Sequence, residues 1–184
     1  MKNFTRNNLL FSLCGLNCCL CPMNIGGYCP GCGGGEGNQS CSIARCSLDH
    51  ERVEYCYLCS DYPCVRFDNV DSSDSFITHR NQFQDIDRVH EIGISLYNEE
   101  LIRKREILNL LLNEYNDGRI KSFYCLAAGL LPLRVLENVI LKIKSDSCMA
   151  EPADLKDRAK QVSDLLVNEA EELGIELKLR RKSE

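Results

Sequence analysis

Apolar residues in the C-terminal part of the chain recur at spacings of three and four, the pattern of amphipathic helices. A short helix ending at Gly93 is predicted first, with an apolar face formed by Phe83, Ile86 and Val89. A longer helix follows, with Asn98 as its N-cap and Gly118 as its C-terminal stop. The apolar face of that helix consists of Leu101, Leu108, Leu111, Leu112 and Tyr115.

Three further helices are predicted beyond Gly118. Residues 123–131 are apolar nearly all round, so they are expected to form a buried central helix. Pro132 then restarts the chain before a helix with the apolar positions Val135, Leu136, Val139, Ile140 and Ile143. The last helix lies between Pro152 and Gly174, and its apolar positions are Leu155, Ala159, Val162, Leu166, Ala170 and Leu173.

Two short segments alternate with the period of a strand. Ile175, Leu177 and Leu179 alternate with charged residues, and this half-buried strand is expected to pair with Val53–Tyr57. The polar stretch 68–75 between the two has the composition of a linker. The predicted fold class is therefore α+β, mostly α: a cysteine-rich module (residues 1–67) packed on a small helical domain (residues 68–184) that ends in a short strand.

Cysteine content changes this ordinary picture. Apolar content of 44% and charged content of 27% are typical of a soluble globular protein, but the chain of 184 residues has thirteen cysteines, eleven of them between Cys14 and Cys64. Such density indicates either disulfides in a secreted protein or a metal site in a cytosolic one. The apolar piece 9–13 is too short for a signal-peptide core, and no run reaches the length of a membrane span. We therefore expect a reducing cytoplasm and no membrane.

The spacing of these cysteines predicts a metal site. Three Cys-x2-Cys pairs, each able to supply two zinc ligands from one turn, are Cys18/Cys21, Cys29/Cys32 and Cys56/Cys59. Cys41, Cys46 and Cys64 lie between and beyond them. Residues 14–64 have few large apolar side chains, so we expect metal, with zinc as the first choice, to replace a core there. Cys125, by contrast, sits in an apolar run and is predicted to be plain core.

Spacing leaves the partition of ligands open. The simplest arrangement has one site of Cys18, Cys21, Cys29 and Cys32 and a second of Cys41, Cys46, Cys56 and Cys59. A crossed arrangement, or a cluster with bridging thiolates, satisfies the same arithmetic. His50 follows Cys46 by four residues and is interpreted as an exposed loop histidine rather than a ligand.

An iron–sulfur cluster is the main alternative cofactor. Cys14-x3-Cys18-x2-Cys21 has the spacing found in radical S-adenosylmethionine enzymes, which place this motif in a β/α barrel. The helical pattern downstream shows no βα alternation, so the spacing is interpreted as coincidence. A second alternative is metal storage or delivery, because eleven clustered thiols exceed what two closed sites need.

Charge bears on the choice of partner. The net charge is −5, and thiolate sites add negative charge to the cysteine-rich segment, so we do not expect nucleic acid to bind there. The basic cluster at the C-terminus consists of Lys178, Arg180, Arg181 and Lys182 and is interpreted as a solvated end. A protein partner of unknown identity fits a non-catalytic binding or regulatory module.

Several motifs resemble one known family. Cys14-Gly15-Leu16-Asn17-Cys18, Tyr28-Cys29-Pro30-Gly31-Cys32 and the run 53–64, with its Cys56, Cys59 and Cys64, follow one another as in the cysteine-rich bacterial and archaeal proteins of domain of unknown function 3795. The similarity continues through 118–128 and 175–180. It implies zinc binding without an established activity. The ligand positions that it implies are Cys14, Cys18, Cys21, Cys29, Cys32, Cys41, Cys46, Cys56, Cys59 and Cys64, with Cys19 as an extra cysteine.

Overall fold

Seven α-helices and three 3-10 helices make up the secondary structure of the residues that the computed structural model describes, which are 3–35, 41–145 and 154–181. The cysteine-rich part contains only short elements: η1 (Cys18–Leu20), α1 (Pro22–Ile25), α2 (Ser42–Asp49), η2 (Cys56–Leu58) and η3 (Val65–Phe67). The helical part contains α3 (Gln82–Ile92), α4 (Ile94–Glu114), α5 (Lys121–Leu130), α6 (Leu133–Ser145) and α7 (Leu155–Glu172). The five helices predicted from the apolar pattern are therefore all present.

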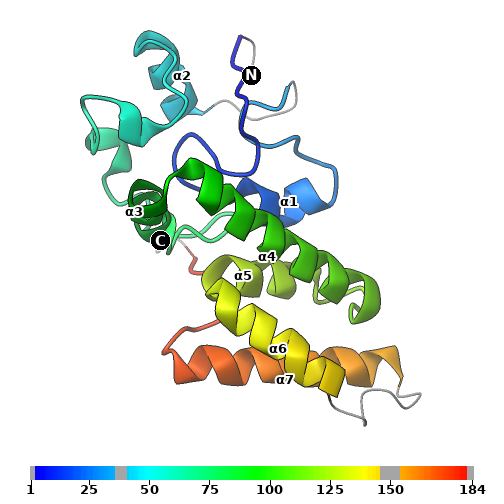
Figure 1. Cartoon of the computed structure of the whole chain (residues 1–184). Coiled ribbons are helices and arrows are strands. Elements are labelled where there is room, and N and C mark those ends of the chain that lie inside the picture. The colour runs from blue at the N-terminus through cyan, green and yellow to red at the C-terminus, as the bar shows by residue number, and fades with distance from the viewer. Residues whose placement is uncertain (1–2, 36–40, 146–153, 182–184) are drawn as a thin grey trace.

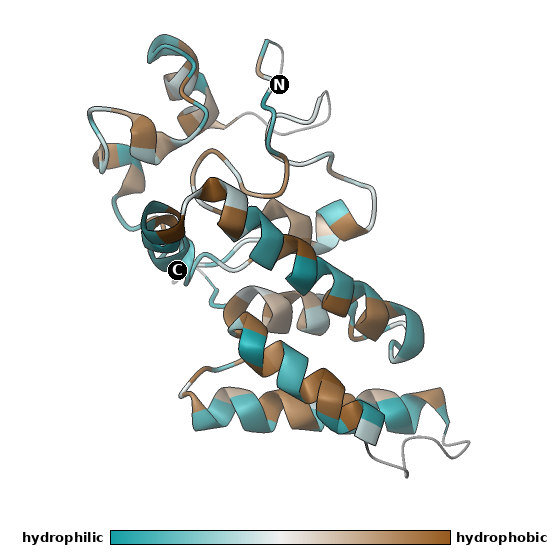
Figure 2. Cartoon of the chain, in the orientation of Figure 1, coloured by the Kyte–Doolittle hydropathy of each residue, from teal (hydrophilic) through white to brown (hydrophobic). Residues whose placement is uncertain are grey.

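The long helix α4 organises this bundle. It contacts α3, α5 and α6, while α7 packs on α6 at the end far from the cysteine-rich part (Figure 1). Brown and teal residues alternate along α4, α6 and α7 in Figure 2, as expected for helices with one apolar face. Residues 124–130 of α5 are all buried, which confirms the predicted central helix. The two ends of the bundle are therefore a cysteine-rich cap and a plain helical pair.

The start of α4 differs from the prediction. Gly93 has a positive φ of 82°, which lets the chain reverse direction after α3 and start the next helix at once, at Ile94. Asn98 is therefore not an N-cap. Its side-chain oxygen instead accepts a hydrogen bond from the amide of Asn8 at 3.0 Å. The polar residue ties the N-terminal segment to the bundle rather than beginning a helix.

The C-terminal stop at Gly174 is confirmed. Gly174 has a φ of 67°, and its N–H donates to the carbonyl of Glu171 at 3.0 Å. The N–H of Ile175 donates to Ala170 at 2.8 Å, which completes a Schellman motif. Pro152, the predicted start of the same helix, lies outside the described residues.

The predicted C-terminal strand is wrong. Residues 175–179 do alternate between partly buried and exposed positions, but they pair with no strand in the part of the chain that the structure describes. The guanidinium of Arg80 instead donates to the carbonyls of Glu176 at 2.6 Å and Lys178 at 2.9 Å. An arginine side chain thus occupies the backbone acceptors that a neighbouring strand would have used.

The predicted strand Val53–Tyr57 is wrong as well. Tyr55 is extended, with φ −139° and ψ 142°, but the chain turns into η2 directly after it. The N–H of Cys56 donates to the carbonyl of Leu13 at 2.8 Å. Over residues 3–35, 41–145 and 154–181 the fold is all-α rather than α+β.

Packing continues across the predicted domain boundary at residue 67. Phe11 and Tyr97 stack edge to face at 5.2 Å, and Phe67 lies 6.0 Å from Phe83 between ring centroids. Buried residues of the cysteine-rich part and of the helical part belong to one core. A second, small cluster consists of Phe4, Leu13 and Ala44. The boundary itself stays a prediction, because this packing shows only that the two parts share a core.

Candidate metal centre

Two of the Cys-x2-Cys pairs bracket a 3-10 turn. The N–H of Cys21 donates to the carbonyl of Cys18 at 3.1 Å around η1, and that of Cys59 donates to Cys56 at 2.9 Å around η2. A tight turn of this kind places two side chains of one pair on the same side of the backbone, as a chelating site requires. Pro22 then starts α1 at its first helical position, which ends the first turn.

The knuckle around Cys32 depends on glycine for a different reason. Gly33 has a φ of 85°, and a Cβ on it would lie 2.7 Å from the Cγ of Arg6. A Cβ on Gly34 would lie 2.3 Å from the carbonyl oxygen of Pro30. The glycines after Cys32 therefore allow close approach of the backbone to its neighbours, and Arg6 is one of those neighbours.

Four cysteines surround one small cavity, which we call the thiol pocket. The pocket is lined by Cys46, Cys56, Cys59 and Cys64, together with His50, Ile43, Ser47, Val53, Tyr62, Arg66 and Phe67. Its volume is about 30 Å³, the space of a single water molecule or ion. Cys46 comes from α2, Cys56 and Cys59 flank the turn of η2, and Cys64 directly precedes η3. Three separate short elements thus bring cysteines to the wall of one cavity, although no three of these sulfur atoms lie within 4.8 Å of one another in the described part of the chain.

Electrostatics within the thiol pocket disfavour free thiolates. Burial raises the pKa of Cys56, and the neighbouring charges of Cys14, Cys64, Cys46 and Cys59 raise it further. Without a cation, Cys56 therefore stays a protonated thiol at neutral pH, and a metal ion that binds there displaces its proton.

A second group of cysteines lies deeper in the N-terminal part. Burial raises the pKa of Cys14 to about 11, although a hydrogen bond with Ser12 lowers it, and the charges of Cys32 and Cys41 add to the increase. Burial also raises the pKa of Cys18, with Cys32 and then Cys14 as its strongest charged neighbours in that direction. Cys14, Cys18, Cys32 and Cys41 are therefore electrostatic neighbours, and Cys14 is also a charged neighbour of Cys56 in the thiol pocket. These contacts fit a crossed arrangement and a cluster with bridging thiolates alike.

The other predicted ligands are placed less closely. Cys21 interacts electrostatically with Cys18 and with Cys125. Cys29 is half-buried, and its carbonyl accepts a hydrogen bond from the amide of Asn24 at 3.0 Å. These contacts assign neither Cys21 nor Cys29 to one group.

Cys19 and Cys125 are buried apart from both groups. Burial raises the pKa of each to about 12. The prediction of Cys125 as core is confirmed, since it is 4% exposed. Cys148 lies outside the described residues.

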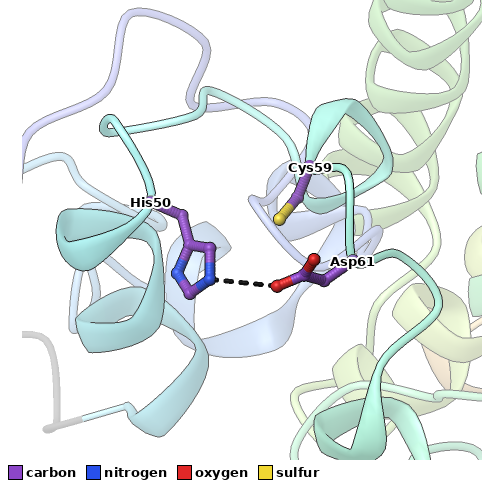
Figure 3. A group of neighbouring side chains, drawn as sticks. All are labelled: His50, Cys59 and Asp61. Carbon is purple, nitrogen blue, oxygen red and sulfur yellow. Dashed lines mark hydrogen bonds and ion pairs between the residues drawn. The ribbon is translucent and has the colours of Figure 1, made fainter.

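One group of unlike ligands lies at the rim of the thiol pocket. The ligand atoms of His50, Cys59 and Asp61 all lie within 4.8 Å of one another, and their side chains point toward one another in Figure 3. His50 Nε2 is 3.2 Å from Asp61 Oδ2, and its Nδ1 is 2.9 Å from the carbonyl oxygen of Cys46. The hydrogen bond with the Cys46 carbonyl raises the pKa of His50, as does the Asp61 carboxylate.

The sequence analysis missed this rim. It interpreted His50 as an exposed loop histidine and did not consider Asp61. His50 is indeed partly exposed, but it caps α2 one helical turn after Cys46, and its Nδ1 is 3.5 Å from that sulfur. In the sequence, the spacings Cys46-x3-His50 and Cys59-x-Asp61 could have indicated this group. Each spacing places the second residue beside its cysteine.

The basic C-terminal cluster is partly committed to contacts within the chain. Arg180 contacts the carboxylate of Asp74 at 3.7 Å and also donates to the carbonyl of Asp71. Lys182 lies outside the described residues. No helix in the described part of the chain is long and apolar enough to cross a membrane.

No protein-family model matches this chain, and no curated protein or solved structure is similar enough to match it. The resemblance to domain of unknown function 3795 is therefore neither supported nor opposed by comparison. The cysteines and the group formed by His50, Cys59 and Asp61 are the features of the described residues that point to metal binding.

Proposed function

We propose that this protein binds zinc through two sets of cysteines that hold its short N-terminal elements in place. The observation that carries the proposal is the thiol pocket, where Cys46, Cys56, Cys59 and Cys64 converge on a cavity of about 30 Å³. Zinc prefers four soft ligands in a tetrahedron, and thiolates from three elements around an ion-sized space provide such a set. The thiols release their protons as they bind the ion, and no electron transfer is involved.

The second proposed zinc site consists of Cys14, Cys18, Cys32 and Cys41. These residues are electrostatic neighbours in the structure, and they come from three stretches of chain, since Cys14 and Cys18 lie four residues apart. Cys21, a charged neighbour of Cys18, and Cys29 are the other two ligands that the sequence predicts, and both serve as reserve donors in the proposal.

The proposed role of zinc is to stabilise the cap. Besides the residues that enter the common core, the described apolar residues buried around α2 form a small cluster of Phe4, Leu13 and Ala44. Structural zinc sites contribute on the order of 10 kcal/mol of folding free energy, far more than such a cluster can. Membership of the domain of unknown function 3795 family, a reducing cytoplasmic location and a protein partner belong to the same proposal.

Metal analysis after purification without oxygen tests the proposal. The wild-type protein is expected to hold about two zinc ions per chain. Cys56→Ser is expected to lose one of them, because Cys56 lines the thiol pocket, and Cys14→Ser the other. Cys125→Ala serves as the control and should retain both ions, since Cys125 lies in the common core.

Two results would contradict the zinc proposal. The first is a metal-free protein with disulfides among these cysteines. The second is a brown protein whose visible and paramagnetic-resonance spectra show a stoichiometric [4Fe–4S] cluster, which would favour the iron–sulfur alternative.

A further inference from the structure

Five metal-binding side chains line the thiol pocket and a sixth lies beside two of them, although a tetrahedral ion uses four. Beyond the four cysteines, His50 lines the pocket and Asp61 lies within 4.8 Å of both His50 and Cys59 in terms of ligand atoms. We propose that His50, Cys59 and Asp61 form an outer exchange site, through which a divalent cation enters and leaves the thiol pocket. This inference rests on the proposed zinc site and adds a function to it, the exchange of metal with a donor or acceptor in solution.

Exposure supports a direction from solvent to pocket. The side chain of Asp61 is 61% exposed and that of His50 is 39% exposed, while Cys59 and Cys56 are both half-buried. An arriving hydrated ion therefore meets the carboxylate and the imidazole before the thiols. Cys59 belongs to both sets, so it can keep hold of the ion while the other ligands are replaced.

Ligand chemistry supports the same order. An oxygen, a nitrogen and a sulfur ligand leave one position of a tetrahedral zinc ion open to water, as in sites that exchange ligands. Four thiolates fill every position and hold zinc more tightly, because soft thiolates suit it better than carboxylate does. The outer set is thus suited to brief binding and the inner set to retention.

The proposed exchange of zinc replaces ligands on the ion and involves no change of oxidation state. Bound waters leave the ion as side chains replace them, and each thiol that becomes a ligand releases its proton to solvent. The bonds to Asp61 and His50 break as those to Cys46, Cys56 and Cys64 form. Loss of zinc follows the same steps in reverse, with an external chelator or protein as the acceptor.

The competing interpretation is purely structural. His50 caps α2 through its contact with the carbonyl of Cys46, and its ion pair with Asp61 at 3.2 Å then only fixes the ring. In that case the rim stabilises the fold slightly and has no effect on metal kinetics. Exposed ion pairs contribute about 0–1 kcal/mol, so the two interpretations differ most clearly in exchange rate.

The rate of zinc transfer to a chelator distinguishes the exchange site from the purely structural interpretation. Zinc-loaded wild-type protein, Asp61→Asn and His50→Ala would be mixed with an excess of a chelator that absorbs when it binds zinc. Both variants are expected to release zinc from the thiol pocket about tenfold more slowly, comparable to the effect of mutating residues around metal ligands, with an unchanged zinc count at equilibrium. Reloading with cobalt(II) should be slowed as well, while its thiolate absorption bands stay as in the wild type.

Glu51→Gln is the matched control. Glu51 is exposed next to His50 and lies outside the ligand group, so its loss of one negative charge should leave both rates unchanged. Rates in Asp61→Asn and His50→Ala that equal those of the wild type would overturn the exchange site and leave the zinc proposal intact. A lower zinc count in either variant would also overturn it, by making the residue a permanent ligand. A wild-type protein without zinc would overturn both proposals.

Discussion

Arg6 donates a hydrogen bond from Nε to the main-chain carbonyl of Glu54 at 3.0 Å, across the whole cysteine-rich part of the chain. Its Nη1 also donates to the carbonyls of Phe11 at 3.0 Å and Cys32 at 3.4 Å, and its guanidinium lies 5.0 Å above the ring of Tyr55. The side chain is only 1% exposed. One buried arginine therefore joins three segments that carry the cysteines.

We predict that Arg6→Leu destabilises the protein by about 3 kcal/mol, because the carbonyls of Phe11, Cys32 and Glu54 lose a charged donor and the Glu54 carboxylate keeps only the N–H of Asn8. Chemical denaturation of the zinc-loaded protein measures the effect. Arg45→Leu is the control, since Arg45 is exposed on α2 and its loss should change the free energy of unfolding by less than about 0.5 kcal/mol. Equal stabilities of the two variants would show that Arg6 does not hold the segments together.

Much of the helical part was predictable because the burial of each helix repeats with the helical period. Leu101, Leu108 and Leu111 of α4 point into the common core, and the apolar run in α5 is buried nearly all round. The strand at 175–179 failed for a long-range reason. Its alternation is real, but Arg80, far away in the sequence, occupies its carbonyls. Local periodicity carries no information about such a partner.

The candidate site was predictable in its residue type and not in its grouping. Cys-x2-Cys spacing indicates which residues can share a turn, whereas the choice of Cys64 over Cys41 beside Cys56 depends on how α2 and η2 pack together. His50 and Asp61 come together for the same tertiary reason. From the sequence alone, His50 and Asp61 look like ordinary surface residues.

Asp74 has a fully buried side chain that connects the predicted linker to the C-terminal segment. It accepts hydrogen bonds from the N–H groups of His79 at 2.8 Å and Arg180 at 2.7 Å. Burial alone would raise the pKa of Asp74, but hydrogen bonds from Arg180, His79 and Thr78 outweigh it and lower the pKa below 3.8. The ionised carboxylate therefore stabilises the fold at neutral pH, and this contribution is lost as the pH falls through the lowered pKa.

We predict that Asp74→Asn costs about 1–3 kcal/mol at pH 7, because an amide nitrogen then faces backbone donors. Hydrogen exchange of residues 176–181 should become faster, and the difference in stability from the wild type should narrow in acid. Asp68→Asn, a change at an exposed carboxylate nearby, should have neither effect. Unchanged exchange of 176–181 in Asp74→Asn would contradict the proposed connection.

Asp85 is expected to have the opposite pH dependence. Burial raises the pKa of Asp85 from 3.8 to about 6, although the charge of Lys104 and hydrogen bonds with Tyr97 and Asn17 lower it. Between these two values the folded state binds the proton more tightly than the unfolded state, so stability falls as the pH rises through this window.

Asp85→Asn removes the titrating group, while its side-chain oxygen can still accept the hydrogen bond that Asn17 donates at 2.9 Å. We predict that the free energy of unfolding of this variant falls less than that of the wild type from pH 4.5 to pH 6.5, values that bracket the upper part of the window. Asp87→Asn, at an exposed position of the same helix, is the control and should keep the wild-type slope. Parallel curves for the wild type and Asp85→Asn would contradict the raised pKa.

Zinc removal is expected to loosen the cap unevenly. α1 and η1 pack against α5 and α4, and Leu20 is 1% exposed in the common core, so these elements have apolar support of their own. α2 packs on the small cluster of Phe4, Leu13 and Ala44, with the partly buried Ile43, Leu48 and Val53 around it. A strong chelator should therefore speed hydrogen exchange in α2 first, while α4 to α7 keep their protection and most of the far-ultraviolet helical signal. Zinc added back should restore the slow exchange. Unchanged exchange in α2 after complete metal removal would mean that Arg6 and the apolar contacts hold this segment without help from the thiols.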